Sequence, residues 1–219
     1  MKTEYGHNIF FYGTSDMQNV LMNRNIRELL NKLHKYDTSI WQHAVGTACV
    51  SELLLDDMNI YGADREDVIT AALLHDVGEI ELPQALFKKE DLSKKDYERL
   101  YKHPFISAKM TGSFVSNHTI MMILSHHRTR DGRGYGIGIP DEMTEIVKVA
   151  DVYVALSEPR PYRNAFSVPE ALGIMDRLAE TGDIDKKIYA RLRKYLFCVG
   201  GAKQACHLPY NCNKYAFSV

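Results

Sequence analysis

The chain has 219 residues, of which 45% are hydrophobic and 25% are charged, and its formal net charge at pH 7 is −1. A nearly neutral chain of ordinary composition lacks the excess positive charge by which proteins bind nucleic-acid polymers, so we expect one globular domain without such a partner. Its N-terminal segment lacks the apolar stretch of a secretion signal, and no other stretch is long and apolar enough to cross a membrane, which predicts a cytoplasmic protein without membrane contact.

Apolar residues recur at helical spacing through the first half of the chain. They predict three helices, over residues 15–34, 39–58 and 64–76. A fourth helix is predicted to be capped by Ser93 and stopped at Pro104, because the residue before a proline disfavours the helical conformation.

The second half continues this pattern on both sides of a glycine-rich loop at residues 129–140. It predicts helices over residues 107–127, 141–157, 167–178 and 183–197. Strand patterns are weak, so the predicted fold class is all-α. We expect a single domain over residues 1–219, with a core at 37–175, an N-terminal helix at 15–34 and a C-terminal helix and tail at 183–219.

Histidine and aspartate residues recur at or near the ends of the predicted helices. Each one alone is weak evidence, but a helical bundle can bring such residues together around a metal ion. Burying them without a cation would leave polar atoms uncompensated. Imidazole and carboxylate ligands together suit iron, manganese, zinc or nickel. The predicted ligands are His43, His75, Asp76, His103, His126, His127 and Asp151.

Five segments resemble the HD superfamily of metal-dependent phosphohydrolases, and more closely its HD-GYP branch, the bacterial cyclic di-GMP phosphodiesterases. They occur in the order and with the spacing of that family, within residues 37–175. The segments are DTSIWQHAVGTACV, AALLHDVGEIELP, LYKHPFISA, ILSHHRTRDGRGYG and KVADVYVALSEPRPYRNAF. The resemblance implies an HD-type helical bundle with a metal site in its core.

The resemblance also implies a role for each residue at a position corresponding to the family's site. The seven histidines and aspartates would bind metal, with Asp76 bridging two ions. Trinuclear members of the family have a glutamate where this chain has Ser39, so we expect two divalent transition metals, iron first, with manganese, nickel or zinc as alternatives. Catalytic positions are Asp76, Glu79 and Asp37, the last an acidic residue behind the ligands. Substrate-contacting positions are Tyr135, Arg160, Arg163 and Arg128.

Four positions depart from the family pattern. The lysine of the HDxGK motif is replaced by Glu79, which places a negative charge where a cation would assist the phosphate. The glutamate of the HHE motif is Arg128, the proline of GYP is Gly136, and a second aspartate three residues after Asp151 is Val154.

The expected function is hydrolysis of a phosphodiester bond in a cyclic dinucleotide, such as cyclic di-GMP, or in a related linear nucleotide, by a metal-activated water. Two alternatives remain open. One is a diiron oxygenase, since some members of the superfamily use similar ligands to activate O₂. The other is a metal-holding signalling domain without turnover, which the substitutions at Glu79, Arg128 and Val154 favour. The expected partner is a small nucleotide, and a homodimer is left open.

Overall fold

The computed structural model describes residues 14–159 and 163–200 of the chain. These residues form α-helices and short 3-10 helices, and no β-strand is present among them. The predicted all-α class is therefore confirmed. Within the described residues, no helix combines the length and apolar character needed to cross a membrane.

The helices follow one another with short connections. Those of the first half are α1 (Ser15–Val20), α2 (Arg24–Tyr36), α3 (Thr38–Met58), α4 (Ala63–Leu74) and the 3-10 helices η1 (Val77–Glu81) and η2 (Gln84–Lys88). Those of the second half are α5 (Lys94–Leu100), α6 (His103–Thr111), α7 (Asn117–Ser125), α8 (Glu142–Ser157), α9 (Val168–Glu180) and α10 (Lys186–Gly200).

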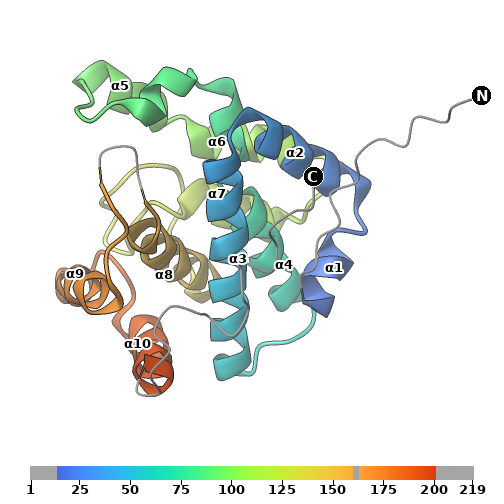
Figure 1. Cartoon of the computed structure of the whole chain (residues 1–219). Coiled ribbons are helices and arrows are strands. Elements are labelled where there is room, and N and C mark those ends of the chain that lie inside the picture. Colours follow the sequence, from blue (N-terminus) through green and yellow to red (C-terminus); the bar gives the residue numbers. More distant parts are fainter. Residues whose placement is uncertain (1–13, 160–162, 201–219) are drawn as a thin grey trace, which may run out of the picture.

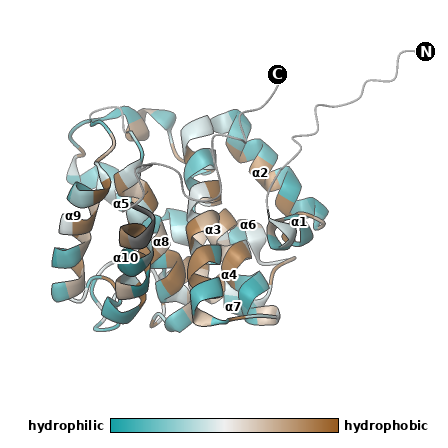
Figure 2. Cartoon of the chain, turned by 60° about the horizontal axis from the view of Figure 1, so that its bottom comes forward, coloured by the Kyte–Doolittle hydropathy of each residue, from teal (hydrophilic) through white to brown (hydrophobic). Residues whose placement is uncertain are grey.

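Helix α3 runs through the middle of the molecule, with α8 on one side and α4 on the other (Figure 1). Its small residues Ala44 and Ala48 are fully buried, which lets the neighbouring helices approach closely. One continuous apolar cluster extends from Met17 to Leu196. In Figure 2 the hydrophobic colour is concentrated on α3 and α4 in the interior. The predicted ligands on these central helices are thereby held in a rigid core.

The prediction of one helix over residues 15–34 was wrong, because the chain breaks between α1 and α2. Asn23 caps α2 by accepting a hydrogen bond from the backbone of Asn25 at 3.0 Å. Arg27 donates to the carbonyl groups of Leu21 and Met22 at the end of α1. These side chains satisfy the backbone groups that the break exposes, so a turn competes with the continuous helix.

The helix predicted over residues 107–127 is also divided, into α6 and α7. Gly112 ends α6, and Ser116 caps α7 by accepting from the backbone of Thr119 at 3.0 Å. The prediction that Pro104 stops a helix was wrong as well. Pro104 lies in the first turn of α6, where its missing N–H is not needed, and α5 ends earlier, at Leu100.

Candidate metal centre

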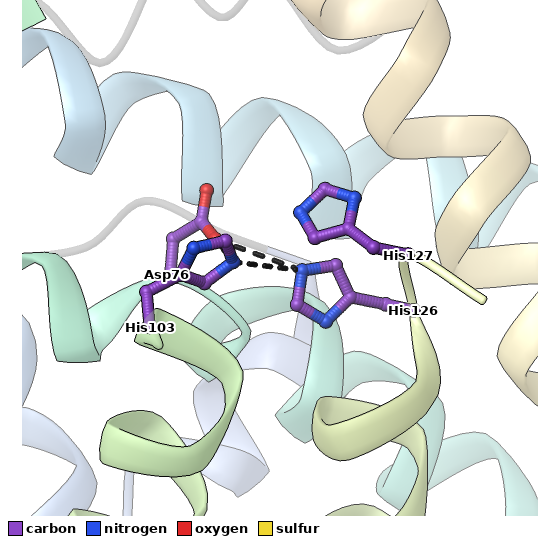
Figure 3. Close-up of side chains that lie close together, drawn as sticks. All are labelled: Asp76, His103, His126 and His127. Atoms are coloured by element: carbon purple, nitrogen blue, oxygen red, sulfur yellow. Dashed lines mark hydrogen bonds and ion pairs between the residues drawn. The ribbon is translucent and has the colours of Figure 1, made fainter. Parts of the chain in front are cut away.

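All seven predicted metal ligands converge in the structure. They come from α3, the end of α4, the start of α6, the end of α7 and the middle of α8. They form two groups, and within each group the ligand atoms lie within 4.8 Å of one another. The groups are Asp76 with His103, His126 and His127, shown in Figure 3, and His43 with His75 and Asp151.

Asp76 lies between the two groups and presents one carboxylate oxygen to each. Its Oδ1 is 3.1 Å from His103 Nε2 and 3.7 Å from His126 Nε2. Its Oδ2 is 3.1 Å from His75 Nε2 and 3.9 Å from His43 Nε2. A carboxylate divided in this way can bridge two cations, one in each group.

His75, His103 and His126 are oriented by the same local contact. In each of them Nδ1 lies 2.7–2.8 Å from the carbonyl oxygen of the residue three positions earlier. A carbonyl oxygen can only accept a hydrogen bond, so Nδ1 carries the proton and donates it. When such a ring is neutral, its unprotonated Nε2 faces the centre, in the form that binds metal.

The atoms that face the centre fit a bound cation. His103 Nε2 and His126 Nε2 are 3.3 Å apart, and Figure 3 shows the two rings pointing toward each other. Two nitrogen lone pairs at that distance repel unless a proton or a metal ion lies between them. Within the described part of the chain, His75 Nε2 and Asp76 Oδ1 are buried without a hydrogen-bond partner. Divalent metal ions would satisfy all these atoms.

The protonation states of the first group agree with metal binding. Burial lowers the pKa of His103, and burial together with neighbouring histidines lowers that of His126 well below its usual value. Burial and His103 lower the pKa of His127 to about 3. Burial opposes ionisation of Asp76, but the nearby histidines outweigh it and hold the pKa of this carboxyl well below its usual value. Neutral imidazoles and an ionised carboxylate are the ligand forms that metals require.

His43 is held by a carboxylate on each side of its ring. Nε2 lies 2.9 Å from Asp151 Oδ1, and Nδ1 lies 3.2 Å from Glu158 Oε2. Burial lowers the pKa of His43, but these hydrogen bonds outweigh burial and raise the pKa to about 10. The sequence analysis missed Glu158. The sequence feature that could have indicated Glu158 is its spacing from Asp151, because a residue seven positions later lies two turns along the same helix face.

His127 is held by aromatic contacts. Its ring centroid is 4.0 Å from that of His126 and 4.4 Å from that of Tyr135, and Tyr135 stacks on Tyr101 at 4.2 Å. Gly134, with φ of 81°, lets the glycine-rich loop pack directly against the backbone of His127, where a Cβ atom would clash. Tyr135 thus lies beside the centre, sandwiched between the rings of His127 and Tyr101, and Tyr101 is a neighbour that the sequence analysis did not identify. Substrate contact by Tyr135 stays a prediction.

The centre borders a cavity of about 480 Å³. This volume is typical of small-molecule sites, which occupy roughly 300–1,000 Å³. Its lining includes Asp76, Asp151, Glu79, Tyr135 and Arg163. A nucleotide-sized molecule that enters the cavity would therefore meet both groups of ligands.

Arg163 lines this cavity and is anchored at the end of α8. Its guanidinium donates to the carbonyl oxygens of Ala155 at 2.9 Å, Leu156 at 3.2 Å and Asn164 at 3.0 Å. It also lies over the ring of Phe166, 4.2 Å from the centroid. These contacts fix the position of its positive charge beside the cavity.

Of the other predicted site residues, two do not line the cavity and one lies outside the described residues. Arg128 is not among the residues that line the cavity, and its guanidinium lies beside Gly132 in the glycine-rich loop. Asp37 caps α3 by accepting from the backbone and the hydroxyl group of Ser39, at 2.8 and 2.6 Å. Arg160 lies outside the described residues. Substrate contact by the two arginines and a supporting role for Asp37 stay predictions.

The chain is similar in sequence to two curated proteins. The chain is 32% identical over 160 residues to 3'3'-cGAMP-specific phosphodiesterase 3 of Vibrio cholerae, covering 70% of this chain and 35% of that protein. It is 28% identical to the cyclic di-GMP phosphodiesterase PdeB of Borreliella burgdorferi, covering 77% of this chain and 44% of that protein. The chain thus spans less than half the length of either relative.

A solved structure and a family pattern agree on the fold. The HD domain of the L. monocytogenes phosphodiesterase PgpH matches 79% of this chain and 97% of its own, with a TM-score of 0.59 and 17% sequence identity. That domain has also been solved in complex with cyclic-di-AMP. The HD domain pattern matches residues 29–188, a span that includes all seven predicted ligands. The chain therefore belongs to the HD domain family.

Proposed function

We propose that the chain is a metal-dependent phosphodiesterase of the HD-GYP type that hydrolyses a cyclic dinucleotide. The observation that carries this proposal is Asp76, whose two oxygens face separate groups of ligands beside one cavity. The curated relatives named above as cyclic-dinucleotide phosphodiesterases support the choice of substrate.

The residues of the chain suit this reaction. Two bound divalent ions would acidify water and polarise the oxygens of a phosphodiester. Asp76 and Asp151 supply anionic oxygens, and His75, His103 and His126 turn their Nε2 atoms inward. Arg163 places a fixed positive charge beside the cavity for a second phosphate. Glu79 lines the same cavity and can accept a proton there.

The experiment combines metal analysis with a hydrolysis screen. The purified wild-type chain is expected to hold about two divalent ions, as in two-metal hydrolytic sites, and to cleave cyclic di-GMP or 3'3'-cGAMP. His75→Ala and Asp76→Ala should lose metal and activity together. His118→Ala is the matched control, because His118 pairs with Asp141 away from the two groups, at 2.7 Å.

The other outcomes separate the alternatives. Metal binding without cleavage of any cyclic or linear dinucleotide would favour a silent signalling domain. O₂ uptake on addition of substrate, with mixed-valent iron, would favour a diiron oxygenase. Absence of metal from wild type under supplementation would refute the proposal. The choice of iron, the cytoplasmic location, the homodimer and the single domain stay predictions.

A further inference from the structure

His43 differs from the three histidines that are oriented by backbone carbonyl groups. Its Nδ1 faces the carboxylate of Glu158 at 3.2 Å, whereas those of His75, His103 and His126 face peptide oxygens. His43 is itself 4% exposed, so its orientation is set by protein contacts. Because Nδ1 and Nε2 lie on different sides of the ring, Glu158 approaches His43 from the side away from Asp76.

Helix α8 supplies both carboxylates that hold His43. Asp151 and Glu158 are seven residues apart, which is about two helical turns and one helix face. Val154 lies on this face and packs against Gly46 of α3, where an added Cβ would come within 2.9 Å of Val154 Cγ1 and 3.7 Å of Glu158 Oε1. The missing side chain of Gly46 therefore lets α8 approach α3 closely enough for Glu158 to reach the ring.

Glu158 lies at a position that is unfavourable for a negative charge. It is the C-cap residue of α8, and a negative charge is disfavoured at a helix C-terminus, where the unpaired carbonyl groups lie. Glu158 is not among the residues that line the cavity. Its contact with His43 supplies a stabilising partner, and its position behind the ring separates it from the substrate.

We propose that Glu158 is a positioning residue that sets the metal affinity of the group formed by His43, His75 and Asp151. A carboxylate that accepts the Nδ1 proton fixes the tautomer of the ring, aims Nε2 at the metal and makes Nε2 a stronger donor. The group around His103, His126 and His127 does not depend on this contact. The proposal rests on the metal centre of the proposed function.

The test is a titration of the metal-free chain, residues 1–219, with Mn²⁺, with bound ions counted by equilibrium dialysis. Glu158→Gln keeps an oxygen acceptor but removes the charge, and Glu158→Ala removes both. We expect one of the two ions to bind roughly 10- to 100-fold more weakly to Glu158→Ala, with Glu158→Gln in between, and the other ion to bind as in wild type. Glu142→Gln, an exposed glutamate of the same helix, is the matched control.

Thermal unfolding of each metal-free variant separates positioning from simple stability. A merely structural role would lower the melting temperature without changing the affinity for Mn²⁺. If wild type binds two ions and both Glu158 variants bind two with the same affinities, the inference fails while the proposed function stands. If wild type itself binds no Mn²⁺, both fail.

Discussion

Three histidines of the centre share one local arrangement, a hydrogen bond from Nδ1 to the carbonyl group three residues earlier. All three lie at or next to a helix terminus, in the sequences LLHD, YKHP and LSHH. Because the acceptor is supplied by the same turn of chain, the tautomer is set locally, without a contact from a distant helix. His43 lies inside α3 and takes its Nδ1 acceptor from another helix, at Glu158.

Glu79 adds a negative charge to the cavity lining, beside those of Asp76 and Asp151. A lysine at this position would attract the phosphates that a glutamate repels. We expect Glu79→Lys to lower KM for a dianionic cyclic dinucleotide by on the order of tenfold, because reversing one nearby charge alters binding by at least about 1 kcal/mol. Steady-state kinetics measure the effect.

Glu81→Lys provides the matched control for this prediction. Glu81 belongs to the same 3-10 helix, η1, is exposed and undergoes the same change of charge. An equal fall in KM for both variants would show that net charge alone is responsible. A KM that stays constant or rises in Glu79→Lys would contradict the role assigned to Glu79.

Between elements, close packing of η1 on α6 holds Asp76 against His103. Gly78 makes this possible, because an added Cβ would lie 2.6 Å from both His103 O and Ser107 N. We expect Gly78→Ala to lower the free energy of unfolding by about 1–3 kcal/mol and to weaken metal binding, since η1 and α6 must separate. Urea denaturation and Mn²⁺ titration measure the two effects.

Gly173→Ala is the control for the effect of the residue type. Gly173 lies within α9 with no atom near its Cβ position, so alanine should stabilise the chain there by about 0.5–1 kcal/mol. A stability of Gly78→Ala equal to wild type would mean that the two elements are not tightly packed.

Helix α3 also buries Glu52, which is 1% exposed. Thr14 donates to its Oε1, whereas Oε2 has no hydrogen-bond partner among the described residues. Burial raises the pKa of Glu52 to about 7, against the opposing hydrogen bond from Thr14. The folded pKa lies above the unfolded value of about 4.5, so this group costs stability progressively as pH rises through that window.

Glu52→Gln should therefore stabilise the chain above pH 7 by about 1–2 kcal/mol and have little effect below pH 4.5. Urea denaturation at several pH values measures the difference. Glu98→Gln, an exposed change of the same kind in α5, should show no such dependence. An advantage of Glu52→Gln that shrinks as pH rises would reverse the sign and contradict the argument.

For the whole molecule, metal binding and folding are coupled through His43. In the metal-free chain the pKa of His43 is raised to about 10, so its contribution to stability is present below pH 6.5 and is lost as pH rises through 10. A metal ion must displace this proton. We expect Mn²⁺ affinity to rise between pH 6 and 9 by about tenfold per pH unit for each proton displaced.

The Mn²⁺-induced rise in melting temperature should accordingly be larger at pH 8.5 than at pH 6.5, because tighter binding stabilises the folded state more. Differential scanning calorimetry with and without Mn²⁺ measures it. A rise that is the same at both pH values would mean that binding displaces no proton.

The sequence alone determined the all-α class and the seven histidines and aspartates that converge in the structure. Helical periodicity is a local property, and the ligands lie in short segments whose order and spacing resemble one family. The helix breaks at Asn23 and Ser116 were missed because apolar periodicity continues across both, while the capping bonds that favour a turn involve single polar side chains.

Only the tertiary structure decided how the ligands are divided and what supports them. The position of Asp76 between two groups, the approach of Glu158 to His43 and the stacking of Tyr101 on Tyr135 join residues on different elements. Such contacts depend on the distance between packed helices, which a small residue such as Gly46 sets and which no local pattern encodes.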